Sequence, residues 1–355
     1  MKINHNYFSN LAFNLAEINL GKTQTNPSVG CLVVKNNSVI SSGVTSEKGR
    51  PHAEFNALRK KVNFKNSSIY LTLEPCSHYG LTPPCTKIIR KKKIKSVYYC
   101  FDDPDERTYK KAKKILVKSR INAKRISVKN NNFYKGYFLN KKKNLPLIDG
   151  KIALSRDFFS IDKRSKWITN SKSRLVGHLI RSRYDAIIST SKSINKDNSQ
   201  LNCRIEGLNN NKPELFIIDR NLNLKKNLKI FKIINKRKTF LITTSNNQKK
   251  INFFKQKKFK IIKMKSLTNK EDFIFLFKKI FKLGKSRILI ESGLIFLNEL
   301  LRYNFVSDLF LFMSRKKLGR DGYNNTKINN FKKYNLNKKE NVNLDGESLY
   351  KVEVK

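Results

Sequence analysis

The sequence predicts an α/β protein of two domains, and three observations support this fold class. Short runs of β-branched and aromatic residues alternate with segments of helical period, once before residue 128 and again after residue 149. The run NKKKNLPL at residues 140–147 interrupts the alternation with clustered charge and a proline. A chain of 355 residues also exceeds what one core usually serves. We therefore expect domains at residues 1–145 and 146–355, each with a mostly parallel sheet covered by helices on both faces.

The first domain opens with a helix over residues 5–20, because apolar residues between Phe8 and Ala16 recur at helical spacing and Gly21 follows as a stop signal. Residues 29–35 and 39–45 flank Asn36-Asn37 and predict a hairpin. The remaining elements expected in this domain are a helix at 52–61, a strand at 68–74, a helix at 86–93, a strand at 96–101, a helix at 109–119 and a strand at 123–128.

The second domain shows another alternating series, with no visible repeat of the first. Its expected strands are residues 149–155, 185–190, 215–220, 239–244, 260–265, 287–292 and 309–314, with helices near 171–183, 270–283 and 294–303. The tail at residues 321–347 is too polar to predict much structure.

Cysteine usage and hydropathy indicate a soluble protein of a reducing cytoplasm. The five cysteines are odd in number and follow no disulfide framework. The N-terminal residues are polar and acidic where a signal peptide needs an apolar run. No stretch approaches the roughly 20 apolar residues of a membrane span, so no membrane partner is expected.

The formal charge of +50 would by itself suggest a nucleic-acid binder. The lysines are scattered along most of the chain with Asn, Ile and Phe, which are residues that A+T-rich codons encode, instead of being gathered in one arm. Biased base composition therefore explains the excess at least as well as a nucleic-acid partner does. We expect no nucleic acid; a basic RNA-binding protein is the alternative, and phosphorylated small molecules would also be attracted to such a surface.

The segments PHAEFNALRK and LEPCSHYGLTPPC supply three candidate metal ligands: His52, Cys76 and Cys85. Zinc held by three protein ligands keeps its fourth position for water, which is typical of a catalytic site. Each part has an ordinary explanation, since His-Ala-Glu is common in helices and two cysteines nine apart are often buried thiols. Their order together is specific to zinc deaminases. His78 is the competing ligand, although its place inside the loop suits substrate contact better.

A hydrolytic deaminase must make hydroxide at neutral pH and move protons from that water to the leaving amine. Zinc supplies the first by lowering the pKa of bound water to about 7. Glu54, about half a helical turn beyond His52, is placed to reach the water instead of the ion and is the candidate proton shuttle.

The motifs TNPSVGCLVVKNNSVISSG, PHAEFNAL and LTLEPCSHYGLTPPC resemble the deaminase half of the bifunctional riboflavin-biosynthesis deaminase–reductase family, RibD or RibG. Nucleoside and tRNA deaminases space these cysteines as P-C-x-x-C, without the longer loop. The resemblance implies a cytidine-deaminase-like three-layer α/β/α domain with one zinc on His52, Cys76 and Cys85, and Glu54 as catalytic residue. It also implies that Asn26 binds the pyrimidine, although by itself Asn26 is typical of a turn before Pro27.

The second half resembles the reductase half of the same family through LIDGKIALSRDFFS, SKWITN, LIRSRYDAIISTSKSINKDNSQLNCR and ILIESGLIFLNELL. This implies a dihydrofolate-reductase-like α/β fold that uses NADPH. The implied cofactor contacts are Ala153, Trp167, Ser193, Asp197 and the run from Gly293. The implied substrate contacts are Ser165, Arg181, Leu201, Arg204 and Glu291.

The residues of the second half agree with a nucleotide site of this kind. No G-x-G-x-x-G is present, which argues against a Rossmann site. A strand expected to end at Glu291 is followed by Ser292-Gly293 and a helix N-terminus that could accept phosphate. Arg181 and Arg204 suit a ribose phosphate, because a guanidinium matches phosphate oxygens, although each alone is more often a solvated surface charge.

Two loops of the second half depart from the family pattern. Asp157-Phe158 stands where the family usually has Asp-Gly, and Asn198-Ser199 stands where it usually has Asp-Pro. By default Trp167, the only tryptophan, would be a core residue.

The sequence thus predicts a bifunctional enzyme, a zinc-dependent hydrolase followed by an NADPH-dependent oxidoreductase, acting on a phosphorylated pyrimidine as a homo-oligomer. A tRNA or nucleoside deaminase fused to an unrelated domain is one rival, against which the cysteine spacing speaks. A basic RNA-binding protein with structural zinc is the other; such a zinc would have four protein ligands and no bound water.

Overall fold

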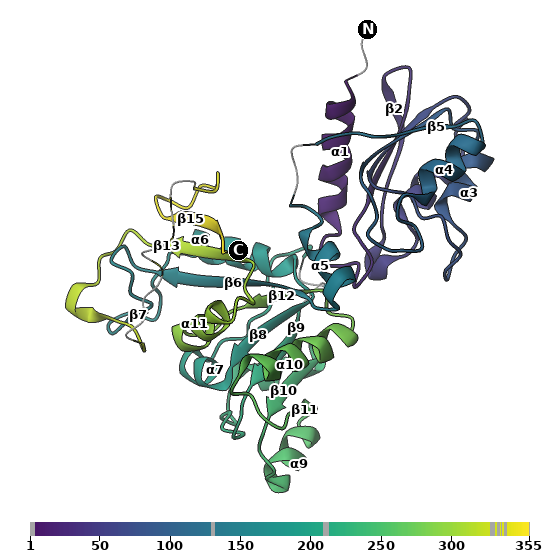
Figure 1. The fold of residues 1–355 in the computed structure, drawn as a ribbon. Helices are drawn as coiled ribbons and strands as arrows, with labels where there is room; N and C mark the ends of the chain where they lie inside the picture. Colours follow the sequence, from purple (N-terminus) through teal and green to yellow (C-terminus); the bar gives the residue numbers. More distant parts are fainter. Residues whose placement is uncertain are drawn as a thin grey trace. The chain divides into compact units, whose positions relative to one another are not determined.

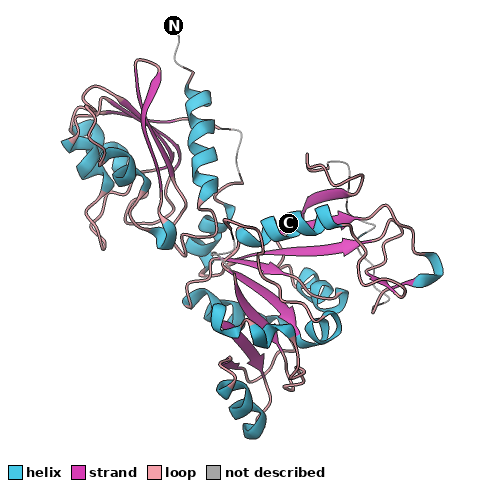
Figure 2. Cartoon of the chain, turned by 180° about the vertical axis from the view of Figure 1, so that it is seen from behind, coloured by secondary structure: helices cyan, strands magenta, loops and turns pink. Residues whose placement is uncertain are grey.

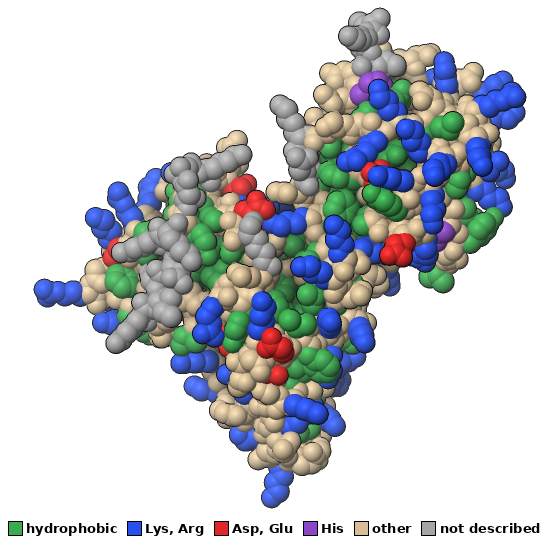
Figure 3. Space-filling model, in the orientation of Figure 1, with side chains coloured by type: hydrophobic (Ala, Val, Ile, Leu, Met, Phe, Trp, Pro, Cys, Tyr) green, Lys and Arg blue, Asp and Glu red, His purple; other side chains and the backbone are tan. Residues whose placement is uncertain are grey.

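The fold is described from a computed structural model, which covers residues 4–128, 132–208, 213–326, 331, 334, 336 and 339–354. It divides into two compact units, Met1–Asn144 and Leu145–Lys355 (Figure 1). Within these described ranges no helix is both long and apolar enough to span a bilayer. Lysine and arginine side chains are spread over the visible surface of both units (Figure 3).

The first unit is built on a five-stranded sheet with the order β2-β1-β3-β4-β5. The strands are β1 (Gly30–Lys35), β2 (Ser38–Val44), β3 (Ser68–Leu73), β4 (Ser96–Phe101) and β5 (Asn122–Arg125). β1 is antiparallel to β2 and β3, whereas β3, β4 and β5 are parallel. Asn36 and Asn37 both have positive φ and close the predicted hairpin, which suits asparagine in a tight turn.

Helices cover both faces of this sheet and make three layers. They are α1 (His5–Ile18), α2 (Ala53–Leu58), α3 (Cys85–Lys91), α4 (Lys111–Lys118) and α5 (Lys135–Lys143), with a 3₁₀ turn at Glu47–Gly49. Phe8 and Ala12 of α1 pack against Leu32 and Tyr70 on one face. Residues of α2, α3 and α4 pack against the alternate residues of the same strands on the other face. Period-two side-chain alternation in the strands thus builds an α/β/α sandwich.

The second unit contains an eight-stranded sheet with the order β11-β10-β9-β8-β12-β6-β13-β15, in which only β15 is antiparallel. The strands are β6 (Leu147–Leu154), β8 (Ala186–Thr190), β9 (Glu214–Ile218), β10 (Thr239–Thr243), β11 (Lys260–Lys263), β12 (Arg287–Ile290), β13 (Asp308–Met313) and β15 (Ser348–Glu353). The pair β7 (Ile161–Asp162) and β14 (Gly322–Tyr323) forms a separate small sheet.

Helices cover both faces of the large sheet (Figure 2). They are α6 (Ser171–Ser182), α7 (Ser191–Asp197), α8 (Lys229–Lys232), α9 (Gln248–Gln256), α10 (Lys270–Lys282) and α11 (Leu294–Arg302), with 3₁₀ turns at Ile234–Lys236 and Gly319–Asp321. Residues of α10 and α11 pack with Ile188 and Ile290 on one face. Residues of α6, α7 and α9 pack with Ile187 and Leu289 on the other.

Three expectations from the sequence need correction. The run at residues 140–147 is not all linker, because residues 140–143 end α5 and Leu147 starts β6. The helix expected at 52–61 stops at Leu58. Described parts of the polar tail are structured, since Gly322–Tyr323 is a strand and Leu344 is buried; other parts of that tail lie outside the described residues.

Both departures from the family pattern fall on left-handed backbone. Phe158 has φ +66° and Asn198 has φ +46°. Asparagine adopts this conformation readily, whereas a side chain such as that of Phe158 costs roughly 1–2 kcal/mol there. The structure thus explains why glycine suits position 158.

We expect Phe158→Gly to be more stable than Phe158→Ala by about 1 kcal/mol, because both remove the ring but only glycine relieves the left-handed strain. Urea unfolding followed by the fluorescence of Trp167 measures the difference in free energy. An alanine variant equal to or more stable than the glycine variant would contradict the expectation.

Candidate metal centre and reductase site

Three elements bring the predicted ligands together in the first unit. His52 is the N-cap of α2, Cys76 follows the end of β3, and Cys85 begins α3. Their ligand atoms all lie within 4.8 Å of one another. The Cys85 N–H donates to Cys76 Sγ at 3.2 Å, which fixes the two ends of the connecting loop.

The spacing of these atoms fits a tetrahedral zinc ion. His52 Nδ1 lies 3.7 Å from Cys76 Sγ and 3.4 Å from Cys85 Sγ. Tetrahedral zinc, with zinc–sulfur bonds of about 2.3 Å and zinc–nitrogen bonds of about 2.0 Å, requires a nitrogen–sulfur separation of about 3.5 Å. Hydrogen bonding from the Cys85 thiol is the main cause that lowers the pKa of Cys76 to about 4. The donor set and its geometry therefore suit the metal.

Glu54 lies beside the three ligands in the first turn of α2 and is buried. Burial is the main cause that raises its pKa to about 7. Gly43 on β2 allows α2 to approach, because a Cβ there would lie only 2.3 Å from the Ala53 carbonyl oxygen. The Asn56 side-chain amide also donates to the Val44 carbonyl, which ties α2 to β2.

Glu74 is a further buried carboxylate near the metal centre, and the sequence motifs did not single it out. Glu74, two residues before Cys76, accepts hydrogen bonds from the N–H groups of Asp103, Lys110 and Ala112. It thereby holds the loop after β4 against the cysteine loop. A glutamate directly after an apolar strand was the available signal.

The other two residues predicted at this centre are held by polar contacts. His78 is not part of the ligand group; its Nδ1 lies 2.9 Å from Thr108 Oγ1. The Asn26 amide donates to the Gly49 carbonyl at 3.2 Å and so orders the segment that leads to His52.

In the second unit, Glu291 is the centre of a buried charged cluster at the carboxyl end of β12. Arg181 donates to both of its carboxylate oxygens, at 2.5 and 2.8 Å. Lys151 on β6 lies 4.0 Å away, because β6 is hydrogen-bonded to β12 with Gly150 opposite Ile290. Burial would raise the pKa of Glu291, but Arg181 and Lys151 outweigh it and lower the pKa.

Lys151 is a candidate that sequence reasoning missed. Burial lowers the pKa of its ammonium group, and Glu291 offsets this only in part. The available signal was a lysine inside a central strand whose residues, apart from Asp149, are otherwise apolar or glycine, since charge is rare there unless paired.

Several residues predicted from the resemblance lie near the same end of the sheet. The Gly293 N–H, at the start of α11, donates to Ser193 Oγ at 3.0 Å, although the two are 100 positions apart. Arg204 Nη1 donates to Asn202 Oδ1. Leu201 is buried and has φ +50°. Such strained backbone is concentrated at functional sites.

The other predicted cofactor and substrate residues lie on different elements of the second unit. Ala153 lies on β6, and Asp197 ends α7. Trp167 is 51% exposed, so its default assignment to the core is wrong; Arg174 lies over its ring at 4.7 Å. Ser165 Oγ accepts from the Trp167 N–H within a local turn.

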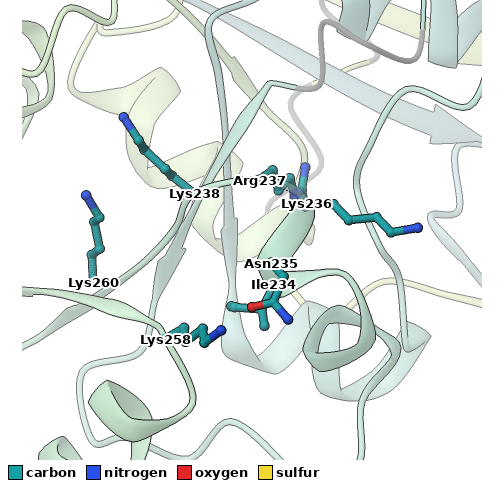
Figure 4. A pocket seen from close by; sticks show the side chains of 7 residues that line it. All are labelled: Ile234, Asn235, Lys236, Arg237, Lys238, Lys258 and Lys260. Atoms are coloured by element: carbon teal, nitrogen blue, oxygen red, sulfur yellow. The ribbon is translucent and has the colours of Figure 1, made fainter.

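A basic hollow of about 490 Å³ lies beside the starts of β10 and β11, the last two strands at one edge of this sheet (Figure 4). Its lining residues are Ile234, Asn235, Lys236, Arg237, Lys238, Lys258 and Lys260. These residues precede or begin β10 and β11, whereas Glu291 follows β12, and the three strands run parallel with β8 and β9. The hollow therefore opens beside the starts of β10 and β11, although its Arg237 also donates to the Leu201 carbonyl at 2.7 Å; we assign the hollow no part in the reaction.

Comparisons with known proteins agree with both sites. Residues 2–101 match the family described as the cytidine and deoxycytidylate deaminase zinc-binding region, and residues 148–349 match the RibD C-terminal domain. RibD from Buchnera aphidicola is 32% identical over 88% of this chain and 87% of its own length. The chain belongs to the RibD family. This membership confirms the predicted fold class and the predicted bifunctional deaminase and reductase of riboflavin biosynthesis.

Other RibD proteins show the same extent of similarity. RibD from Aquifex aeolicus is 29% identical over 90% of this chain and 88% of its own length. A solved structure from Thermotoga maritima has a TM-score of 0.83, 26% identity and 98% coverage of both chains. It is described as a diaminohydroxyphosphoribosylaminopyrimidine deaminase and 5-amino-6-(5-phosphoribosylamino)uracil reductase. The Acinetobacter baumannii RibD structure, at 24% identity and a TM-score of 0.82, shares the fold.

Proposed function

We propose that the chain carries out two consecutive reactions at separate sites. The deaminase domain, residues 1–145, hydrolyses the exocyclic amine of 2,5-diamino-6-(5-phosphoribosylamino)pyrimidin-4-one. The reductase domain, residues 146–355, uses NADPH to convert the ribosyl chain of the product to ribityl, giving 5-amino-6-(5-phosphoribitylamino)uracil. The observation that carries the proposal is the set of His52, Cys76 and Cys85 at zinc-ligand spacing with buried Glu54 beside it.

In the deaminase site, His52, Cys76 and Cys85 hold the metal. Zinc bound there would lower the pKa of a water to about 7. With the metal bound, Glu54 would act as the proton shuttle between water and the leaving amine, which its position beside the ligands allows. Asn26 contacts the pyrimidine from the segment that it orders with Gly49.

In the reductase site, NADPH would supply the hydride, with cofactor contacts from Ala153, Trp167, Ser193, Asp197 and Gly293. The Gly293 start of α11 offers N–H groups to a cofactor phosphate. Ser165, Arg181, Leu201, Arg204 and Glu291 are the proposed substrate contacts.

The two arginines of this site differ in their present partners. Arg204 has no ion pair with a carboxylate among the described residues, so its guanidinium suits the substrate phosphate. Arg181 would have to exchange part of its pairing with Glu291 to contact phosphate.

Incubation of the full chain with the diaminopyrimidinone phosphate and NADPH tests the proposed function. Product masses should first show exchange of an amine for an oxygen and then, only with NADPH, the gain of two hydrogens. Reduction that precedes deamination, or no mass change with folded, zinc-loaded protein, would refute the proposed sequence of reactions. A cytoplasmic location and a homo-oligomeric state are further predictions.

We expect about one zinc per purified chain, and Cys85→Ser should lose most of it, because two remaining ligands hold zinc poorly. Metal analysis by mass spectrometry measures both. Cys100→Ser is the matched control, because Cys100 is a buried thiol outside the ligand group. Full zinc occupancy in the Cys85→Ser variant would refute the ligand assignment.

A further inference from the structure

We propose that Arg50 binds the phosphate of the deaminase substrate and makes that site selective for phosphorylated pyrimidines. The inference rests on the proposed function, in which the substrate carries a phosphoribosyl group. It concerns the first unit alone and adds a residue that neither the sequence motifs nor the metal-ligand geometry had assigned.

Arg50 stands at the rim of the metal centre. It lies two residues before His52, and its guanidinium reaches the loop that connects Cys76 and Cys85. There Nη1 donates to Thr82 Oγ1 at 2.6 Å. The side chain is thus anchored beside the centre, and its other nitrogens make no hydrogen bond to the described residues.

One edge of the guanidinium lies next to Gly80 in the cysteine loop. Arg50 Nη2 lies 3.7 Å, and His78 Nε2 3.9 Å, from the point where a Cβ on Gly80 would stand. Because Gly80 has no side chain, this space between the guanidinium and the imidazole is unfilled by residue 80. His78 keeps its orientation through the contact of Nδ1 with Thr108.

No acidic side chain neutralises Arg50 among the residues that the structure describes. Arg107 and Arg125 of the same unit instead pair with Asp105 at 2.7 Å and with Asp102 at 2.9 Å. An anchored guanidinium without a carboxylate is suited to an external anion, since charge-assisted N–H bonds to phosphate are strong and directional.

The chemistry of the substrate keeps its phosphate away from the metal ligands, as binding at this rim requires. The amine that is hydrolysed must lie over the metal beside Glu54, and the ribose phosphate extends from another position of the ring. The phosphate must therefore be bound outside the ligand triad. The Thr82 hydroxyl accepts from Arg50, so its own hydrogen is free to donate to the same anion.

The test compares two substrates in the full-length, zinc-loaded protein: the diaminopyrimidinone with its ribose phosphate, and the same compound lacking the phosphate. The measured quantity is the ratio of their kcat/KM values for deamination. We expect Arg50→Gln to lower this ratio roughly 10- to 100-fold, mainly through KM for the phosphorylated compound. Arg50→Lys should retain part of the preference, because it keeps the charge but not the planar fork.

Two variants separate phosphate binding from other effects. Arg59→Gln removes the same charge from an exposed position in the same unit and should leave the ratio unchanged. Thr82→Val removes the anchoring hydroxyl but keeps the guanidinium, so it should lower the ratio less than Arg50→Gln does. Ribose 5-phosphate should inhibit wild-type deamination competitively and inhibit the Arg50→Gln variant more weakly.

An unchanged ratio in Arg50→Gln, or inhibition by ribose 5-phosphate equal to that of the wild type, would overturn the inference. A purely structural role for Arg50 would lower both rates together and leave the ratio unchanged, which also overturns it. If the wild-type, zinc-loaded protein deaminates neither compound, the proposed function itself fails; wild-type deamination with an unchanged ratio in the variant refutes the role of Arg50 alone.

Discussion

Glu54→Gln should abolish deamination and leave reduction intact. The substitution keeps the size of the side chain and its place in the first turn of α2 but removes its capacity to take up and release a proton. Loss of a general acid–base group costs at least roughly 10²-fold in kcat. Mass spectrometry of the pyrimidine product measures deamination, and NADPH absorbance with already deaminated substrate measures reduction.

Two controls make this result specific. Zinc content should match that of the wild type, because Glu54 is not in the ligand group. Glu47→Gln removes the same charge from an exposed side chain of the same unit and should leave both activities unchanged. A deamination rate of Glu54→Gln within threefold of the wild-type rate would show that Glu54 is not the proton shuttle. Loss of both activities in a folded variant would indicate one shared site and refute the proposal of two.

The local elements of both units could be predicted because their signals lie in short windows. Apolar runs of β-branched and aromatic residues marked the central strands, and Asn36-Asn37 marked the hairpin. Helices α5, α7, α8 and α9 were not expected from the sequence, because their patterns are weaker. In α7 only Ile194 is buried, and in α9 only Ile251 and Phe254 are buried. Most other residues of both helices are polar, so neither helix shows a wide apolar stripe.

The metal ligands were accessible to sequence reasoning because the catalytic chemistry limits their residue types and their order. His52 and Glu54 share one helix start, and the two cysteines lie at the two ends of one loop with prolines. The charged cluster of the second unit was less accessible. Lys151 meets Glu291 only because β12 lies between β8 and β6, and strand order is not encoded in any local pattern.

Arg50 was missed for a similar reason. An arginine in a basic chain of net charge +50 carries no signal by itself. Its place became informative only when the structure showed the guanidinium anchored to Thr82, in the loop between two ligands.

Arg181→Met should destabilise the second unit by about 3–5 kcal/mol. It leaves the Glu291 carboxylate buried without its bidentate partner, which is the costly way to break a buried ion pair. Both side chains are largely shielded, with 14% and 8% exposed. Denaturant unfolding followed by Trp167 fluorescence reports on this unit, because Trp167 is the only tryptophan of the chain.

The matched controls distinguish an unpaired buried charge from a simple loss of contacts. Lys172→Met breaks an ion pair with Asp345 in which both side chains are about half exposed, so it should cost less than about 1 kcal/mol. The triple variant Arg181→Met, Glu291→Leu and Lys151→Met removes all three charges of the cluster, so no buried charge is left unpaired, and it should recover most of the lost stability, although it loses reduction. A triple variant as unstable as Arg181→Met alone would show that packing, not charge, causes the loss.

The pH dependence of the same variant gives an independent check with a defined sign. In the wild type, Arg181 helps to lower the pKa of Glu291, so the stability from this pair is present above the ordinary glutamate pKa and is lost as the pH falls through the lowered value. In Arg181→Met, burial should instead raise the pKa of Glu291, although Lys151 at 4.0 Å limits the rise. The folded variant then binds more protons than its unfolded chain near the glutamate pKa, so its deficit relative to the wild type should narrow as the pH falls toward that range. A deficit that does not change with pH would mean that the charge of Glu291 is not the source of the destabilisation.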